Sequence, residues 1–103
     1  RRTLRSGQRI HYAGNVVIMG DVNPGAVVVC TGDIVVFGRL RGVAHAGAQG
    51  NVHARVVAFR LEPTQLRIAH YISRAPDEGP GGPDLPEVAL VNNGVIEIQA
   101  FLP

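Results

Sequence analysis

One short pattern, repeated along the first half of the chain, constrains the fold more than any other feature. With Gly14, Gly32 and Gly50 aligned, the sequence reads GNVVIMG (14–20), GDIVVFG (32–38) and GNVHARV (50–56). Each copy keeps Gly, then Asn or Asp, then an apolar residue, at an 18-residue step. The same step places residues 6–8 over residues 24–26, so the repeat begins before Gly14. A fixed period of this length is typical of a solenoid.

The repeated segments have the pattern of β-strands. Gly-Asn and Gly-Asp pairs tolerate the positive φ angles of tight turns, and the runs between them alternate at period 2 and are rich in β-branched residues. The pattern predicts an all-β solenoid of three or four coils whose inward residues stack from coil to coil. The predicted inward set is Ile10, Val16, Ile18, Val28, Cys30, Ile34, Val36, Ala46 and Val52.

The residues of opposite parity on the same strands are also apolar: Val17, Met19, Val35 and Phe37. On a lone solenoid they form an exposed apolar patch, and large patches of this kind usually mark an interaction surface. We therefore expect a homodimer interface at these four residues. The alternatives are that inside and outside are reversed, or that the C-terminal segment covers this face.

The second half of the chain is expected to close the solenoid. Residues 52–61 continue the last coil, and residues 65–73 favour a further strand over a short helix because Leu66, Ile68 and His70 alternate. Residues 76–86 form a Pro/Gly loop. Segments 87–91 and 95–100 flank Asn-Asn-Gly and predict a hairpin that caps the open end. We expect residues 1–103 to be one domain, excised from a longer protein.

Composition and motifs argue against catalysis. The net charge is only +2 and Trp is absent, so nucleic-acid binding is not expected. The four histidines, His11, His45, His53 and His70, lack the spacing of a metal site. The single Cys30 lies in an apolar run, as a core side chain in a reducing compartment would. No catalytic residue, metal or cofactor is predicted, and no apolar run is long enough to span a membrane; the expected location is the cytoplasm.

Two arginine-containing corners are the candidate binding residues. Ser6 and Gly7 fall on a turn position of the repeat, so Arg5 and Gln8 are displayed from a fixed corner; an ordinary solvated turn is the alternative. Arg41 lies between an apparent core leucine and a turn glycine, so its guanidinium should point outward, either to pair with Asp33 or to bind a partner.

These segments resemble the C-terminal domain of MinC, the bacterial septum-site inhibitor. The resemblance rests on RSGQRI (5–10), GDIVVFGRLRG (32–42), AHAGAQG (44–50) and IAHY (68–71). It implies a short right-handed β-helix of triangular section that dimerises through one side and binds the ATP-bound form of the membrane-associated ATPase MinD. It further implies that the full-length protein acts on the division tubulin FtsZ, and that the membrane is reached only indirectly, at its inner face, through MinD.

The resemblance also assigns residues. The MinD-binding motif falls on Arg5, Ser6, Gly7 and Gln8, with Arg41, beside Gly42, as a secondary contact. Some relatives carry an arginine after this Arg-Gly pair that is implicated in contacting the FtsZ tail, whereas this chain has Val43. A second interpretation, from a different class, is a β-helix that polymerises end to end as a scaffold, as bactofilins do.

Overall fold

The computed structural model describes residues 2–74 and 85–101, and these residues form ten β-strands and no helix. The strands are β1 (Arg9–Tyr12), β2 (Val16–Ile18), β3 (Val27–Cys30), β4 (Ile34–Leu40), β5 (Val43–Ala46), β6 (Val56–Leu61), β7 (Gln65–Ile68), β8 (Tyr71–Arg74), β9 (Glu87–Asn92) and β10 (Val95–Ala100). The all-β prediction is therefore confirmed.

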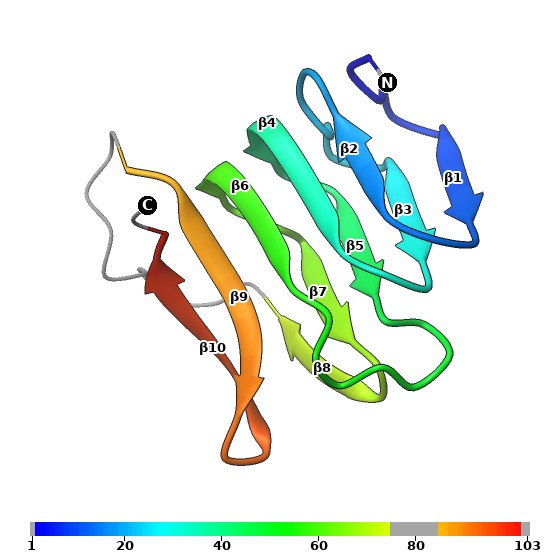
Figure 1. Cartoon of the computed structure of the whole chain (residues 1–103). Helices are drawn as coiled ribbons and strands as arrows, with labels where there is room; N and C mark the ends of the chain where they lie inside the picture. The colour runs from blue at the N-terminus through cyan, green and yellow to red at the C-terminus, as the bar shows by residue number, and fades with distance from the viewer. Residues whose placement is uncertain (1, 75–84, 102–103) are drawn as a thin grey trace.

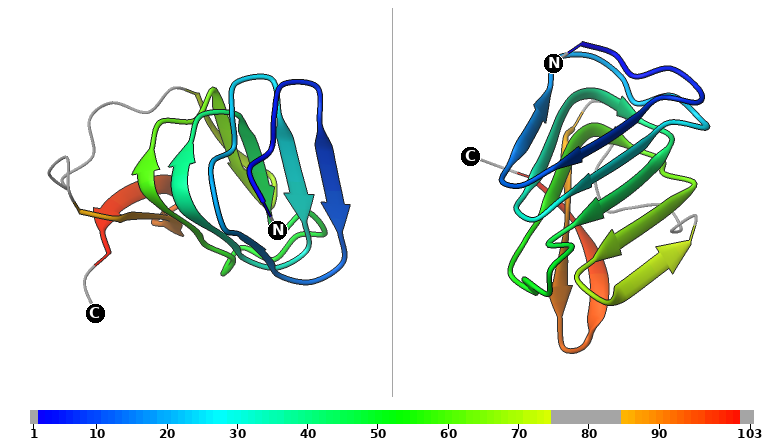
Figure 2. Two further views of the ribbon diagram at one scale, coloured as in Figure 1. Left: turned by 90° about the horizontal axis from the view of Figure 1, so that it is seen from above. Right: turned by 90° about the vertical axis from the view of Figure 1, so that its right-hand side faces the viewer.

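The chain coils around a triangular core. Two five-stranded sheets form two sides, in the orders β1-β3-β5-β7-β8 and β10-β9-β6-β4-β2, and pairing between successive coils is parallel (Figure 1). The third side, here called the narrow side, is held by the isolated bridges Leu4 to Val22 and Val22 to Leu40. Figure 2 shows the coils stacked along one axis, and parallel crossovers of this kind are right-handed. The structure is thus a short triangular β-helix.

The inward residues of successive coils stack as the repeat predicts. Ile10 pairs in register with Val28, and Val16 and Ile18 pair with Ile34 and Val36. Every member of the predicted inward set except Val52 is buried. Full burial of one such side chain is worth about 1.5–3 kcal/mol, so the stacked columns supply the driving force for coiling.

Side chains at the corners tie each coil to the next. The backbone N–H of Asp33 donates to Asn15 Oδ1 at 2.8 Å, and the N–H of Arg55 donates to Asp33 Oδ1 at 2.8 Å. At a second corner, the N–H of Arg39 donates to Asp21 Oδ1 at 2.8 Å. The Asn and Asp of the repeat therefore satisfy backbone donors of the following coil in addition to favouring turns.

The third copy of the repeat lies four residues further along the chain than the sequence pattern predicts. Ile34 pairs with Val56 rather than with Val52, so the step there is 22 residues instead of 18. Val52 lies in a turn and is partly exposed, and the position that follows Asp33 in the corner is Arg55. The Gly50-Asn51 pair turns the chain within a longer loop, where the N–H of Gly50 donates to the carbonyl of Gly47 at 2.8 Å.

The single strand predicted over residues 65–73 is in fact a hairpin. β7 and β8 pair antiparallel, Ile68 opposite Tyr71, and the chain turns at Ala69 and His70. Ala69 has a φ of 55°, which a continuous strand excludes. Leu66 and Ile68 are buried as expected, whereas His70 is exposed.

The predicted C-terminal hairpin is confirmed. Asn93 and Gly94 have φ angles of 53° and 79°, as a two-residue type I′ turn requires. β9 pairs antiparallel with β6, and side chains of both hairpin strands pack on the core, so the hairpin closes this end of the coil. Most of the predicted Pro/Gly loop, residues 76–86, lies outside the described residues.

Candidate functional site

The corner from Arg5 to Gln8 is a rigid turn. The N–H of Gln8 donates to the carbonyl of Arg5 at 3.0 Å, and the N–H of Arg5 donates back to the Gln8 Oε1 at 2.7 Å. Gly7 has a φ of +88°, the positive angle that a type II turn needs at its third residue. All four residues are exposed, so their outward side-chain atoms are available to a partner.

A second turn of the same kind lies directly beneath the first. In the turn from Asn23 to Ala26, the N–H of Ala26 donates to the carbonyl of Asn23 at 3.0 Å, and Gly25 repeats the φ of +88°. The N–H of Gly7 donates to the carbonyl of Gly25 at 3.0 Å. Stacking of one turn on another explains why the upper corner keeps a fixed shape although it lies at the end of the solenoid.

Arg41 lies on the same line of positions as Arg5, two coils further along. Arg5, Asn23 and Arg41 each follow a residue of the Leu4–Val22–Leu40 bridges. The Arg41 Nη2 donates to Asn23 Oδ1 at 2.7 Å, which settles its hydrogen-bond partner as Asn23 rather than Asp33. The Arg41 N–H donates to the Val22 carbonyl at 2.7 Å, so both its backbone and its guanidinium are held.

The four predicted interface residues share one outward face of the sheet that contains β2 and β4. Val17 pairs in register with Val35, and Val35 pairs with Val57. The structure adds Phe59, whose ring packs edge-on against Phe37 at a centroid distance of 5.6 Å. We call this surface the apolar face. Its members are Val17, Met19, Val35, Phe37, Val57 and Phe59.

Sequence reasoning missed Val57 and Phe59 because it used the 18-residue step throughout. A 22-residue step from Val35 and Phe37 reaches both residues, and their apolar character was the available signal. Several members are strongly exposed: Met19 by 64%, Phe59 by 49%, Val17 and Phe37 by 45% each. The C-terminal hairpin therefore does not cover them, which removes one of the alternatives weighed for this face.

The turn and the apolar face lie on different parts of the triangle. The turn joins the narrow side to β1, whereas the apolar face belongs to the other sheet. The two are therefore separate surfaces of the coil.

The four histidines are the remaining polar candidates for a metal site. His11 and His45 are both in register with Val29, one on each side of it, and His45 Nε2 is 2.8 Å from the Ala69 carbonyl. The His70 ring stacks on Tyr71 at 4.3 Å. Within the described parts of the chain, no group of three or more His, Cys, Asp and Glu side chains is arranged to hold a metal ion.

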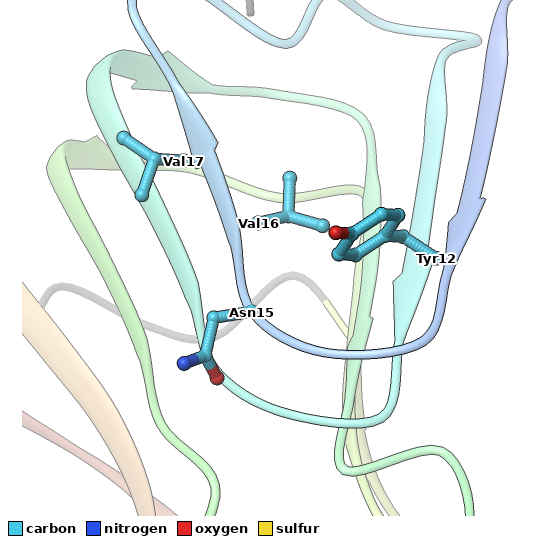
Figure 3. Close-up of a pocket in the computed structure, with 4 residues that line it drawn as sticks. All are labelled: Tyr12, Asn15, Val16 and Val17. Carbon is cyan, nitrogen blue, oxygen red and sulfur yellow. The ribbon is translucent and has the colours of Figure 1, made fainter.

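A shallow pocket of about 250 Å³ lies at the first coil, lined by Tyr12, Asn15, Val16 and Val17. Figure 3 shows the Tyr12 ring and the Val16 side chain pointing toward each other, with Val17 directed away. It offers one hydroxyl and one amide as polar groups and is separate from the Arg5–Gln8 turn.

Cys30 is part of the core. Its Sγ lies 3.3 Å from the Gly32 carbonyl oxygen and 3.4 Å from that of Asp33, so the single S–H can donate to either one. Burial, assisted by the negative charge of Asp33, raises the pKa of the Cys30 thiol. The protonated thiol is a structural side chain with little nucleophilic character.

Comparison with known proteins identifies the family. The family model described as septum formation inhibitor MinC, C-terminal domain, matches residues 1–101. The chain belongs to this family. A probable septum site-determining protein MinC from Heliobacterium modesticaldum is 57% identical over 101 residues, covering 98% of this chain and 35% of the relative. The homologue from Symbiobacterium thermophilum is 59% identical over 99 residues, covering 96% of this chain and 43% of the relative.

A solved structure has the same fold. The chain superposes with a TM-score of 0.90 and 40% identity on a chain of the MinC:MinD cell division protein complex of Aquifex aeolicus, covering 99% of this chain and 83% of that one. The chain spans only about a third to a half of the length of the curated MinC relatives. Among the described residues there is no helix with the length and apolarity that a membrane crossing requires.

Proposed function

We propose that this chain is the MinD-binding and dimerisation domain of a non-enzymatic cell-division inhibitor. Membership of the MinC family and likeness to a chain of a MinC:MinD complex support this proposal. The observation that carries it is the rigid turn from Arg5 to Gln8, which presents the matching RSGQ motif in a fixed shape. A preformed turn loses little conformational entropy on binding.

Arg5 is the proposed main anchor and Arg41 the secondary contact. An arginine fork makes charge-assisted hydrogen bonds to carboxylates, and arginine is enriched at binding hot spots. Ser6 and Gln8 add neutral hydrogen bonds, worth about 0.5–1.5 kcal/mol each. Gly7 contributes the backbone shape, because its positive φ disfavours any other residue.

The apolar face is the proposed homodimer interface. Val17, Met19, Val35 and Phe37 form its sequence-predicted part, and Val57 and Phe59 extend it. A two-fold contact between copies of this face buries each of these residues in both subunits. Dimerisation then presents two MinD-binding turns on one particle, which raises avidity for a membrane coated with MinD.

In the cell, the domain recruits the whole protein to ATP-bound MinD at the inner face of the membrane. The domain itself stays cytoplasmic and reaches the membrane only through MinD. FtsZ assembly is then inhibited by the full-length protein, which blocks septum formation at the wrong sites.

Sedimentation with vesicles tests the proposal. The domain is mixed with MinD and phospholipid vesicles in the presence of ATP or ADP. We expect the domain to sediment with MinD and ATP, and to stay in the supernatant with ADP or without MinD. A domain that stays in the supernatant in every mixture would rule out MinD binding.

A further inference from the structure

The Arg41–Gly42 corner lies directly under the turn that supports the RSGQ motif. Three corners stack in successive coils on this part of the triangle: residues 5–8 in the first coil, 23–26 in the second and 41–42 in the third. We call the turn of residues 23–26 the middle turn. It carries the motif turn above it and is itself carried by the third coil.

The backbone of the third coil packs closely against the middle turn. The N–H of Val43 donates to the carbonyl of Ala26, the last residue of this turn, at 2.9 Å. Gly42 is buried, and a Cβ atom at its position would collide with the carbonyl oxygens of Asn23 and Ala26. Only a residue without a side chain therefore lets the third coil approach the middle turn this closely.

The Arg41 side chain reaches the same turn. Its Nη2 donates to Asn23 Oδ1 at 2.7 Å, and its Nε is buried, so the guanidinium lies against the coil. The Thr64 hydroxyl donates to the Arg41 carbonyl at 2.9 Å, which holds the arginine backbone from the following coil. A hydrogen bond from a charged donor is stronger than a neutral one. Because Asn23 begins the middle turn, this bond fixes the turn at its first residue.

The middle turn passes this constraint on to the motif. The Asn23 carbonyl accepts the Ala26 N–H that closes the turn, at 3.0 Å. The Gly25 carbonyl, within the same turn, accepts the Gly7 N–H of the motif at 3.0 Å. A continuous support therefore runs from the Arg41 guanidinium through the middle turn to the motif.

We propose that Arg41 and Asn23 position the RSGQ motif for MinD from within the chain. This role is separate from the contact proposed for Arg41, and it makes Asn23, which lies outside the motif, a positioning residue. It rests on the proposed function, because MinD is the partner for which the motif is positioned. The contacts that carry it all lie inside the domain.

Amide hydrogen exchange at the Gly7 N–H tests the support in the free domain, without the partner. Asn23→Ala removes the acceptor of the Arg41 hydrogen bond, whereas Asn23→Asp keeps an oxygen acceptor in the same place. We expect exchange at Gly7 to be about tenfold faster in Asn23→Ala and in Arg41→Ala, which is the equivalent of one charge-assisted hydrogen bond. It should be unchanged in Asn23→Asp. Exchange at Gly7 that neither alanine variant accelerates would overturn the inference.

Asn15→Ala is the matched control, because Asn15 Oδ1 also accepts a hydrogen bond from the next coil, from the Asp33 N–H at 2.8 Å. Its corner lies between β1 and β2, away from the motif turn. This variant should lose similar stability in thermal unfolding and keep Gly7 exchange and MinD binding within about twofold of the unmodified domain. If Asn15→Ala accelerates Gly7 exchange as much as Asn23→Ala does, the coil is loosened as a whole and the specific support is disproved.

A double-mutant cycle with MinD separates positioning from contact. Binding to ATP-bound MinD is measured for Asn23→Ala, for Arg41→Ala and for the double variant. We expect Asn23→Ala to weaken binding about fivefold, and to add less than about twofold when residue 41 is already alanine. Asn23→Asp should restore binding. Additive losses would mean that the two side chains touch MinD independently, which contradicts positioning through Asn23.

The outcomes separate this inference from the proposed function. If the unmodified domain binds MinD and Arg5→Ala abolishes binding, but Asn23→Ala binds normally, the inference is overturned and the proposed function stands. If the unmodified domain does not bind MinD, the proposed function itself fails. Circular dichroism and sizing of each variant confirm that fold and assembly are kept.

Discussion

Ser6 rests directly on Gly25, one coil below it, and the space between them is too small for a methyl group. A Cβ atom at Gly25 would collide with the Ser6 hydroxyl and approach its Cβ to 3.1 Å. The lower turn therefore determines the position of the upper one, and a residue outside the RSGQ motif controls the shape of the motif.

Substituting Gly25→Ala should weaken MinD binding without unfolding the protein. The new methyl displaces Ser6, and the positive φ of Gly25 costs an alanine about 1–2 kcal/mol. A domain with a typical stability of about 5–15 kcal/mol remains folded after such a loss. Binding is measured by vesicle sedimentation with MinD and ATP, and folding by thermal unfolding.

Gly50→Ala is the matched control for this prediction. Gly50 also has a positive φ, of 104°, but nothing lies within 4 Å of the position of its Cβ. This variant should lose a similar amount of stability and keep full MinD binding. If Gly25→Ala also binds normally, the stacked turn does not control recognition.

Arg5→Ala should lose recruitment to MinD-coated vesicles while remaining a folded dimer. Truncation of a hot-spot arginine commonly costs about 2 kcal/mol or more, which is roughly 30-fold in affinity. Arg5 is exposed and lies off the core columns, so its loss removes no internal packing. Binding titrations and size-exclusion chromatography measure the two properties.

Arg9→Ala, four residues away on β1, is the control for charge alone, because Arg9 is likewise exposed. It should bind within about twofold of the unmodified domain. Recruitment of a folded Arg5→Ala dimer at the unmodified level would move the anchor elsewhere, first to Arg41.

Phe37→Asp should convert the proposed dimer into folded monomers. Phe37 packs on Phe59 within the apolar face, and burying its exposed part against a second copy is worth about 2 kcal/mol at ~25 cal/mol per Å². The change occurs twice in a symmetric dimer, so the total is about 4 kcal/mol, or roughly a thousandfold in dissociation constant. Light scattering on a sizing column gives the mass.

Val29→Asp places the same charge on the other sheet and should leave the dimer intact. Val29 is a half-buried outward residue of β3, in register with His11 and His45. Dimers that persist in Phe37→Asp and in Val35→Asp at micromolar concentration would place the interface on another side.

The Cys30 thiol should react with alkylating reagents only when the protein unfolds. The side chain has no exposed surface, and burial raises its pKa, so the reactive thiolate is scarce in the folded state. Because the pKa of this thiol is higher in the folded chain than in the unfolded chain, it contributes to the free energy of unfolding. That contribution is fully present below the ordinary thiol pKa and is lost as pH rises through the pKa of the folded state. Labelling at pH 8 should therefore be slow, and should become fast in guanidinium chloride.

Iodoacetamide labelling followed by mass spectrometry measures this difference. Rapid labelling without denaturant would show that the coil opens at Cys30 far more often than its buried position implies.

The sequence carried enough information for the coil but not for its exact register. Ile10, Val16 and Ile34 could be aligned because Gly-Asn and Gly-Asp corners mark the 18-residue step twice. The prediction placed Val52 in the inward column because Gly50-Asn51 has the sequence of such a corner. Val56, which occupies that column, is also a valine, so the residue type alone does not distinguish the two. Only three-dimensional pairing distinguishes the two, since a longer loop changes the step without changing the local pattern.

The sequence was enough to propose the residues of the candidate site, but not to predict the contacts that hold them in place. Arg5 and Gln8 were assigned from the motif, and the turn that holds them agrees with the corner expected from the repeat. Neither the Arg41 to Asn23 hydrogen bond nor the contact between Ser6 and Gly25 could be found in advance. Both depend on residues of successive coils coming within a few ångströms, and the period of the repeat does not specify a side-chain distance of that kind.

The hairpin that closes the C-terminal end makes the two ends of the coil different. Among the described strands, β1 and β2 form the open edge, and both run in the sense of the coil. At the other end β8 runs against β7, whereas β10 has the same sense as β6 because two antiparallel pairings intervene. A second copy could continue the coil at this end only if the edge strands β8 and β10 both ran in the sense of the coil. The last coil is therefore no template for a following molecule in the parallel sense, so copies of the described chain cannot stack end to end as one continuous parallel coil.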